Sequence, residues 1–166
     1  YFPLWALFMD WFKEDRPRPS GDPNYFCDLD LFNGSKDRNF RAEGRGYCSL
    51  INNRDPEGNR AKIFDRLSKH KKVDSYGGFL NNMGGRKLGG MQFEKCDLLK
   101  DYKFNIAFEN LQHEGYNTEK IMQPLESGCI PIYWGGNKAK KYFNPDSYID
   151  VDDYESFEAV ADRVLE

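Results

Sequence analysis

The sequence predicts an α/β fold, in which helices flank a parallel β-sheet, and three consecutive segments of the chain indicate it. Residues 104–108 and 129–134 are short apolar runs with the length of buried strands. Between them, residues 118–127 have helical character, and Gly128 stops that helix. A strand, a helix and a second strand in this order form a parallel unit, so we expect a Rossmann-like sheet with flanking helices.

The preceding part of the chain fits the same fold. Residues 47–51 are strand-like, and residues 63–67 carry apolar side chains at helical spacing. We expect Asp55 to cap this helix and Pro56 to occupy its first position, where a missing N–H does no harm. Residues 73–75 predict a further short strand.

Four more elements are expected towards the C-terminal end. Residues 91–99 favour a weak helix, residues 138–142 a short helix and residues 148–150 a strand. A last helix is expected from Tyr154 onwards. The side chains on its buried face should be Phe157, Val160 and Val164.

The first 46 residues have a different character. Residues 1–9 are apolar, but Asp10 ends this run far short of a membrane span, and we expect a chain cut from a longer protein. Residues 13–46 are rich in Asp, Arg, Gly, Pro and Asn with little periodicity, which favours loops. We therefore expect residues 47–166 to form one domain and residues 1–46 to be a remnant or a linker.

Composition excludes some functions. The net charge of -3 lacks the strongly basic character of nucleic-acid-binding proteins, although a local basic pocket is compatible with it. The four cysteines lack metal-ligand spacing, and a disulfide among them stays open. Cys48 and Cys129 are interpreted as core residues, and His70 and His113, without partners at metal or triad spacing, as surface residues.

Two positively charged residues lie near helix starts, where a positive charge is unfavourable. Arg60 and Lys120 each follow a strand and lie near the beginning of the next helix, where the helix dipole disfavours positive charge by about 0.3–1 kcal/mol. Ligands of open parallel sheets bind beyond the carboxyl ends of the strands. Two such cations on successive units therefore suggest an anion between them, and pyrophosphate is the obvious candidate.

Each of these residues also has a purely structural interpretation. Arg60 could be a solvated helix residue that pairs with Glu57, and Lys120 could pair with Glu119 or Glu126 on a helix surface. From spacing alone these alternatives stay open.

Two neighbouring residues are equally ambiguous. Tyr116 could pack as a hydrophobic staple beside the helix start, and Asn110 could be an ordinary turn residue. The motifs GxGxxG, GxxxxGKS/T and GxSxG do not occur. From the residues alone, we expect a Rossmann-like domain that binds a nucleotide phosphate.

Four segments resemble the signature of a known family. Residues 102–110 read YKFNIAFEN, 115–121 GYNTEKI, 128–135 GCIPIYWG and 142–149 YFNPDSYI. They are similar to the α1,3-fucosyltransferases of glycosyltransferase family ten, and the match extends over about residues 47–154. The resemblance implies a two-domain glycosyltransferase of the GT-B type, with this chain as its C-terminal, donor-binding half and residues 1–46 as acceptor-side remnant or linker.

The resemblance also implies a donor site. By position, Arg60 and Lys120 would contact the diphosphate of GDP-fucose, and Glu119 would hold the ribose. Asn110 and Tyr116 would help to seat the nucleotide.

The implied reaction is an inverting transfer of fucose from GDP-fucose to a glycan hydroxyl, such as that of an N-acetyllactosamine-type oligosaccharide. It requires no cofactor and no divalent metal of necessity, and the family's general base lies upstream of this chain. We therefore expect no catalytic residue here, with Glu109 organising the site, and an inactive fragment that self-associates through residues 1–12.

The sequence differs from the family pattern at one place, and two alternative functions stay open. The family often has Ser-Asn where this chain has Asn52 and Asn53. The alternatives are a non-catalytic nucleotide-sugar-binding module and a transferase that uses another GDP-sugar, such as GDP-mannose.

Overall fold

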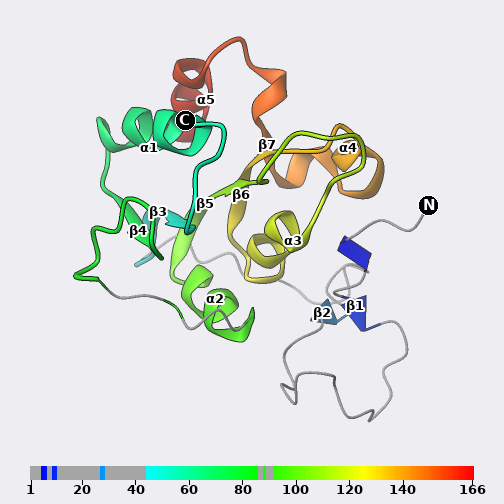
Figure 1. Cartoon of the computed structure of the whole chain (residues 1–166), viewed down its shortest axis with the longest axis horizontal. Helices are drawn as coiled ribbons and strands as arrows, with labels where there is room; N and C mark the ends of the chain where they lie inside the picture. Colours follow the sequence, from blue (N-terminus) through cyan, green and yellow to red (C-terminus); the bar gives the residue numbers. More distant parts are fainter. Residues whose placement is uncertain (1–4, 7–8, 11–26, 29–43, 86–87, 89–91) are drawn as a thin grey trace.

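In the computed structural model, the described residues are 5–6, 9–10, 27–28, 44–85, 88 and 92–166. Within them, a sheet of five parallel strands forms the centre of the molecule, in the order β4-β3-β5-β6-β7 (Figure 1). The strands are β3 (Gly46–Ile51), β4 (Val73–Tyr76), β5 (Tyr102–Phe108), β6 (Ile130–Trp134) and β7 (Ile149–Asp150). The predicted parallel α/β fold is confirmed.

Helices flank this sheet on two sides (Figure 1). They are α1 (Asn59–Ser68), α2 (Gln92–Leu99), α3 (Glu119–Glu126), α4 (Ala139–Tyr142) and α5 (Phe157–Leu165). Short 3-10 turns, η3 (Pro145–Ser147) and η4 (Val151–Asp153), lie on either side of β7.

Alternate residues of the central strands point into two different cores. Ile106 and Phe108 of β5 pack in one apolar cluster with side chains of α1 and α5. Ala107, which lies between them, packs instead with Ile121 and Met122 of α3. Because both faces of the strand are buried, β5 reads as a nearly continuous apolar run, as strands of parallel sheets do.

Two helices begin later than the sequence predicts. α1 starts at Asn59 instead of Pro56, because Gly58 takes a left-handed conformation (φ 68°) that closes a turn from Asp55. Asp55 still caps the helix from this turn, since its carboxylate accepts from the backbone N–H groups of Arg60 and Ala61 at 3.1 and 2.9 Å.

The last helix, α5, starts at Phe157, with Ser156 as its N-cap, instead of Tyr154. Its expected buried face is correct for Val160 and Val164, whereas Phe157 is only partly buried.

Two apolar residues of the N-terminal segment, Trp5 and Met9, pack onto this domain. The Trp5 ring lies 5.6 Å from that of Tyr142 and 5.4 Å from that of Phe143, and Ala6 and Met9 are buried. For these residues, the expected exposed apolar patch is wrong, because Ala6 and Met9 are buried and Trp5 and Met9 pack in one apolar cluster with residues of α3, α4 and β6. Residues 1–4, 7–8 and 11–12 of the expected patch, and most of 13–46, lie outside the described residues.

The short strands β1 (Met9–Asp10) and β2 (Cys27–Asp28) form a separate parallel pair.

The isolated cysteines and histidines lie where the sequence predicts them. Cys48 and Cys129 are buried free thiols, and burial raises the pKa of both. His70 and His113 are exposed. Among the described helices, none has both the length and the apolar character needed to cross a membrane.

Candidate functional site

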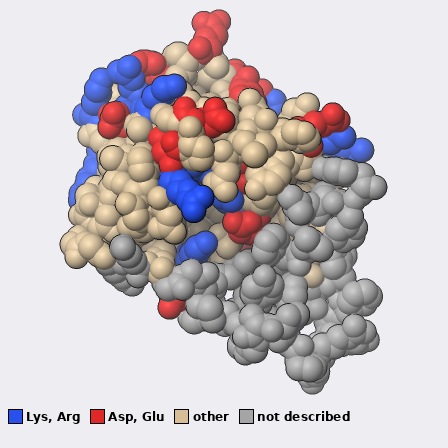
Figure 2. Space-filling view, viewed as in Figure 1, with Lys and Arg blue, Asp and Glu red and all other residues tan. Residues whose placement is uncertain are grey.

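A cavity of about 320 Å³ lies at the carboxyl ends of β3 and β5, beside α2 and α3. This volume is at the lower end of the range for small-molecule sites, about 300–1,000 Å³. Basic and acidic side chains lie close together near the middle of the face shown in Figure 2. The polar residues that line the cavity are Asn52, Asn53, Arg54, Lys95, Asn105, Asn110, Glu119, Lys120 and Gln123.

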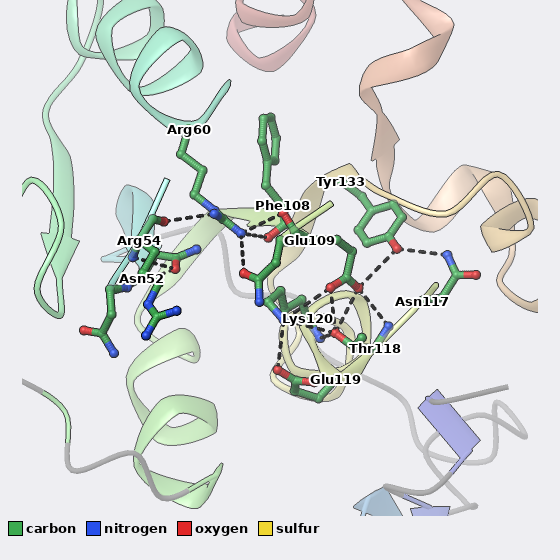
Figure 3. Close-up of polar contacts among 12 residues, drawn as sticks. Asn52, Arg54, Arg60, Phe108, Glu109, Asn117, Thr118, Glu119, Lys120 and Tyr133 are labelled. Atoms are coloured by element: carbon green, nitrogen blue, oxygen red, sulfur yellow. Dashed lines mark hydrogen bonds and ion pairs between the residues drawn. The ribbon is translucent and has the colours of Figure 1, made fainter. Parts of the chain in front are cut away.

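The loop after β3 forms one wall of this cavity. The Asn52 carboxamide oxygen accepts from the backbone N–H groups of Asn53 and Arg54, which folds the loop back on itself (Figure 3). Gly77 lies against this loop so closely that a Cβ atom there would be 2.5 Å from the Asn52 carbonyl oxygen. The close packing of backbone on backbone holds Arg54 at the cavity.

Arg60 lies behind this wall, not in it. Its side chain is 1% exposed, and one terminal nitrogen, Nη1, donates to the Arg54 carbonyl oxygen at 2.9 Å. The other, Nη2, donates to the carbonyl oxygens of Phe108 and Glu109 at 2.6 and 2.7 Å and to Asn110 Oδ1 at 3.2 Å (Figure 3). Burial lowers the pKa of Arg60, in spite of nearby carboxylates. The solvated alternative for Arg60 is therefore wrong.

Lys120 lines the cavity in the first turn of α3. Its Nζ lies 3.2 Å from a carboxylate oxygen of Glu109, 3.2 Å from one of Glu119 and 3.2 Å from Thr118 Oγ1 (Figure 3). Burial acts to lower the pKa of Lys120, but the two carboxylates outweigh it and raise that pKa. Pairing with Glu119, the structural alternative for Lys120, is thus present, and Glu109 is an additional partner.

Glu109 is the buried centre of this cluster. Its side chain is 0% exposed, and its carboxylate accepts from the backbone N–H and the hydroxyl of Thr118 at 2.8–2.9 Å and from the Tyr133 hydroxyl at 3.3 Å. Burial raises the pKa of Glu109, although Lys120 and Thr118 act in the opposite direction. Glu109 therefore joins the end of β5 to the start of α3 and holds Lys120 from behind.

The pKa of Glu119 is lowered, in contrast to that of Glu109. Burial acts to raise the pKa of this carboxyl, but Lys120 and the hydrogen bonds at the start of α3 bring it below its ordinary value. Both Glu119 and Lys120 keep 22% of their side chains exposed at the cavity. Each can therefore reach a ligand.

A second layer supports the start of α3. The Asn117 carboxamide donates to the Tyr133 hydroxyl at 2.9 Å and to the Gly136 carbonyl oxygen at 3.0 Å. Gly136 packs so closely that a Cβ atom there would lie 2.7 Å from the Tyr116 backbone nitrogen. The segment before α3 is thus fixed against the end of β6.

The structure brings three of the five expected donor-site residues to the cavity. Asn110, Glu119 and Lys120 line it, whereas Arg60 lies behind its wall and Tyr116 is not among the lining residues. Six polar lining residues were not expected in the site: Asn52, Asn53, Arg54, Lys95, Asn105 and Gln123. Only Asn105, a polar residue inside an apolar strand, gave a usable signal.

Comparison with known proteins identifies the family. Residues 41–166 match the model of the glycosyltransferase family 10 (fucosyltransferase) C-terminal domain. The chain is 35% identical over 120 residues to the alpha-(1,3)-fucosyltransferase FucT of Helicobacter pylori, covering 72% of this chain and 24% of the relative. It is 34% identical over 125 residues to alpha-(1,3)-fucosyltransferase 7 of Mus musculus, covering 72% of this chain and 30% of the relative. The chain thus spans less than a third of these relatives.

Solved structures agree in fold. A crystal structure of an alpha1,3-fucosyltransferase with GDP-fucose superposes with a TM-score of 0.67 at 32% identity, covering 81% of this chain and 37% of that one. One with GDP has a TM-score of 0.66 at 35% identity, covering 73% and 34%. The chain belongs to glycosyltransferase family 10, the fucosyltransferases, and its five-stranded parallel sheet is that of the family's C-terminal domain.

Proposed function

We propose that this chain binds GDP-fucose as the donor half of a transferase that moves fucose to a glycan hydroxyl with inversion. The observation that carries the proposal is the cavity at the carboxyl ends of parallel strands, where Lys120 and Glu119 meet at the start of a helix. A solved relative of the same fold holds GDP-fucose. Backbone N–H groups and the dipole at a helix start both favour a phosphate there.

The proposal assigns Lys120 to the diphosphate and Glu119 to the ribose. The two side chains pair with each other at 3.2 Å, so each already lies within reach of a ligand that separates them. A phosphate takes the place of Glu119 at the ammonium group of Lys120, and the carboxylate released in this way accepts from the ribose hydroxyls. Glu109 keeps its contact with Lys120 throughout and prevents the ammonium from moving away.

The proposal assigns supporting roles to Arg60, Asn110 and Tyr116. Asn110 lines the cavity and accepts from Arg60 Nη2, so the guanidinium acts on the donor through this carboxamide and through its charge. Tyr116 precedes α3, and its backbone is tied to the end of β6 by a hydrogen bond from the Gly136 N–H at 3.2 Å.

Transfer needs groups that this proposal places elsewhere in the full-length enzyme. We expect the general base upstream of the donor half, and residues 1–46 to belong to the acceptor side or to an interdomain linker. As GDP leaves, negative charge builds on its β-phosphate, and the cations of Lys120 and Arg60 stabilise it. In this scheme side-chain cations carry the role that a divalent metal has in other transferases. The acceptor we propose is an N-acetyllactosamine-type glycan.

Calorimetric titration of the chain with GDP-fucose, GDP-mannose and UDP-galactose tests the proposal. We expect GDP-fucose to bind and UDP-galactose to bind at least about tenfold more weakly, because the two donors carry different bases and different sugars. Tighter binding of GDP-mannose would favour a transferase for another GDP-sugar. Absence of binding to every GDP-sugar would refute the proposed function.

A further inference from the structure

Two buried carboxamides line the cavity away from its charged end. Asn105 lies in the middle of β5, and Gln123 lies one turn into α3. Both residues line the cavity, and both are only 6% exposed. The proposed phosphate and ribose contacts leave these two side chains without a role.

The hydrogen bonds of Asn105 are only half used. Ser49, its neighbour across the sheet on β3, is fully buried and donates its hydroxyl to Asn105 Oδ1 at 2.9 Å. This bond determines which way the carboxamide is turned, because its oxygen faces Ser49 and its Nδ2 is left over. Among the described residues, Nδ2 has no hydrogen-bond partner, although it is not sealed from the cavity.

Gln123 has more unused hydrogen-bonding groups than Asn105. Its backbone carbonyl oxygen accepts from Ser127, but its side-chain carboxamide has no hydrogen-bond partner among the described residues. Buried carboxamides are almost always hydrogen-bonded, to protein groups or to ordered water. Two unpartnered carboxamides that line one cavity therefore offer their free hydrogen-bonding groups to a polar ligand that displaces such water.

The positions of the two residues indicate which part of a ligand they meet. Gln123 lies three residues beyond Lys120, a rise of about 4.5 Å along the helix. Asn105 lies three residues before Phe108, about 10 Å below the end of its strand. In a nucleoside diphosphate the base follows the ribose at the end away from the phosphates. With the phosphates at Lys120 and the ribose at Glu119, the base falls at the inner end of the cavity.

The geometry points to Asn105 and Gln123 as the residues that read the donor's guanine base. This inference rests on the proposed function and deepens it. Guanine presents the acceptors O6 and N7 on one edge, where adenine has a donor, N6–H₂, in place of O6. Asn105, turned by Ser49, offers this edge a donor only. Gln123 can accept from a guanine N–H and donate at the same time.

Titrations of GDP and ADP test the assignment. We use the whole chain, the variants Asn105→Ala, Gln123→Leu and Ser49→Ala, and the phosphate-site variant Lys120→Ala as the control, each checked for folding by circular dichroism. We expect wild type to prefer GDP over ADP and the first two variants to lose about tenfold of that preference, mainly through weaker GDP binding. Lys120→Ala should weaken both nucleotides by the same factor and leave their ratio unchanged.

Ser49→Ala provides a test at a residue that does not line the cavity. Without the serine hydroxyl, the Asn105 carboxamide can turn over and present its oxygen, so the preference for GDP should fall while binding of ADP is kept or improved. This variant also keeps the inference testable if Asn105→Ala does not fold.

These titrations distinguish failure of the base assignment from failure of the proposed function. If wild type binds GDP and the Asn105, Gln123 and Ser49 variants keep its GDP-to-ADP ratio, the base assignment is refuted and the proposed function stands. If wild type binds neither nucleotide, both are refuted.

Discussion

Replacing Lys120 by alanine should damage donor binding and folding for two separable reasons. The side chain is the cation of the proposed phosphate site, and it is also a partner of Glu109, which has no exposed side-chain area. Alanine removes the phosphate contact and leaves the Glu109 carboxylate buried without a cation. The double variant Lys120→Ala/Glu109→Gln no longer has an unpaired buried carboxylate, but it still lacks the phosphate contact.

The structure allows both effects to be given a size. Loss of a charge-assisted hydrogen bond to phosphate costs about 1.5–3 kcal/mol, which weakens GDP binding roughly ten- to a hundredfold. Breaking a buried ion pair costs about 3–5 kcal/mol, but Lys120 is 22% exposed and Thr118 still donates to Glu109, so we expect about 2–3 kcal/mol. For a domain of this size, that lowers Tm by about 4–12 °C.

The stability loss should depend on pH. Burial already raises the folded-state pKa of Glu109, and removal of Lys120 takes away the strongest influence that lowers it. An acid whose pKa is higher in the folded state binds more protons there, so the free energy of unfolding falls as pH rises above the unfolded value of about 4.3. Lys120→Ala should therefore lose more stability at pH 8 than at pH 5, and the double variant should not.

Calorimetric titration of GDP and thermal melting at the two pH values provide the measurements. Lys69→Ala is the matched control, because Lys69 is an exposed lysine at the C-cap of α1, where the helix dipole favours a cation. We expect Lys69→Ala to bind GDP like wild type, and the double variant to regain stability without regaining affinity. Equal GDP affinities for folded Lys120→Ala and Lys69→Ala would refute the phosphate assignment.

Three further perturbations test other parts of the structure. Arg60→Gln should lower the free energy of unfolding by about 2–4 kcal/mol in urea denaturation, because the buried carbonyl oxygens of Phe108 and Glu109 lose their donor. An unchanged denaturation midpoint would show that these hydrogen bonds do not stabilise the fold. Gly136→Ala should destabilise the chain by about 1–3 kcal/mol and weaken GDP binding, because the new Cβ atom would clash with the Tyr116 backbone. If calorimetry finds the wild-type Tm and the wild-type GDP affinity for this variant, the close contact is not needed. The chain alone should not transfer fucose to N-acetyllactosamine, and radiolabelled product in such an assay would show that the base is not upstream.

Elements with a strong periodicity could be predicted from the sequence, and side-chain directions could not. The strand before Glu109 and the helix after Thr118 follow from apolar runs and a glycine stop, and parallel pairing brings their ends together. Lys120 was found in this way, whereas Glu119 was assigned to the site only through the family resemblance. The direction taken by Arg60 depends on carbonyl oxygens almost fifty residues away in β5, which no local pattern encodes.

The residues at the inner end of the cavity could not be predicted from the sequence, because their roles also depend on distant parts of the chain. Asn105 in an apolar strand could have indicated a functional residue, but its meaning depends on Ser49 across the sheet. Gln123 reads as an ordinary helix residue until α3 is placed against the cavity. The late start of α1 likewise depends on Gly58, whose left-handed conformation overrides the helix-start preference of Pro56.

The guanidinium of Arg60 joins two backbone segments that are far apart in the sequence: the loop after β3, through the Arg54 carbonyl oxygen, and the end of β5, through the carbonyl oxygens of Phe108 and Glu109. These segments behave mechanically as a single wall, because neither can swing outwards without breaking a bond to the same side chain. Accommodation of a donor must then come from rotation of side chains at the mouth. Glu119, still 22% exposed, can rotate away from Lys120, whereas Glu109 holds the ammonium group of Lys120 in place.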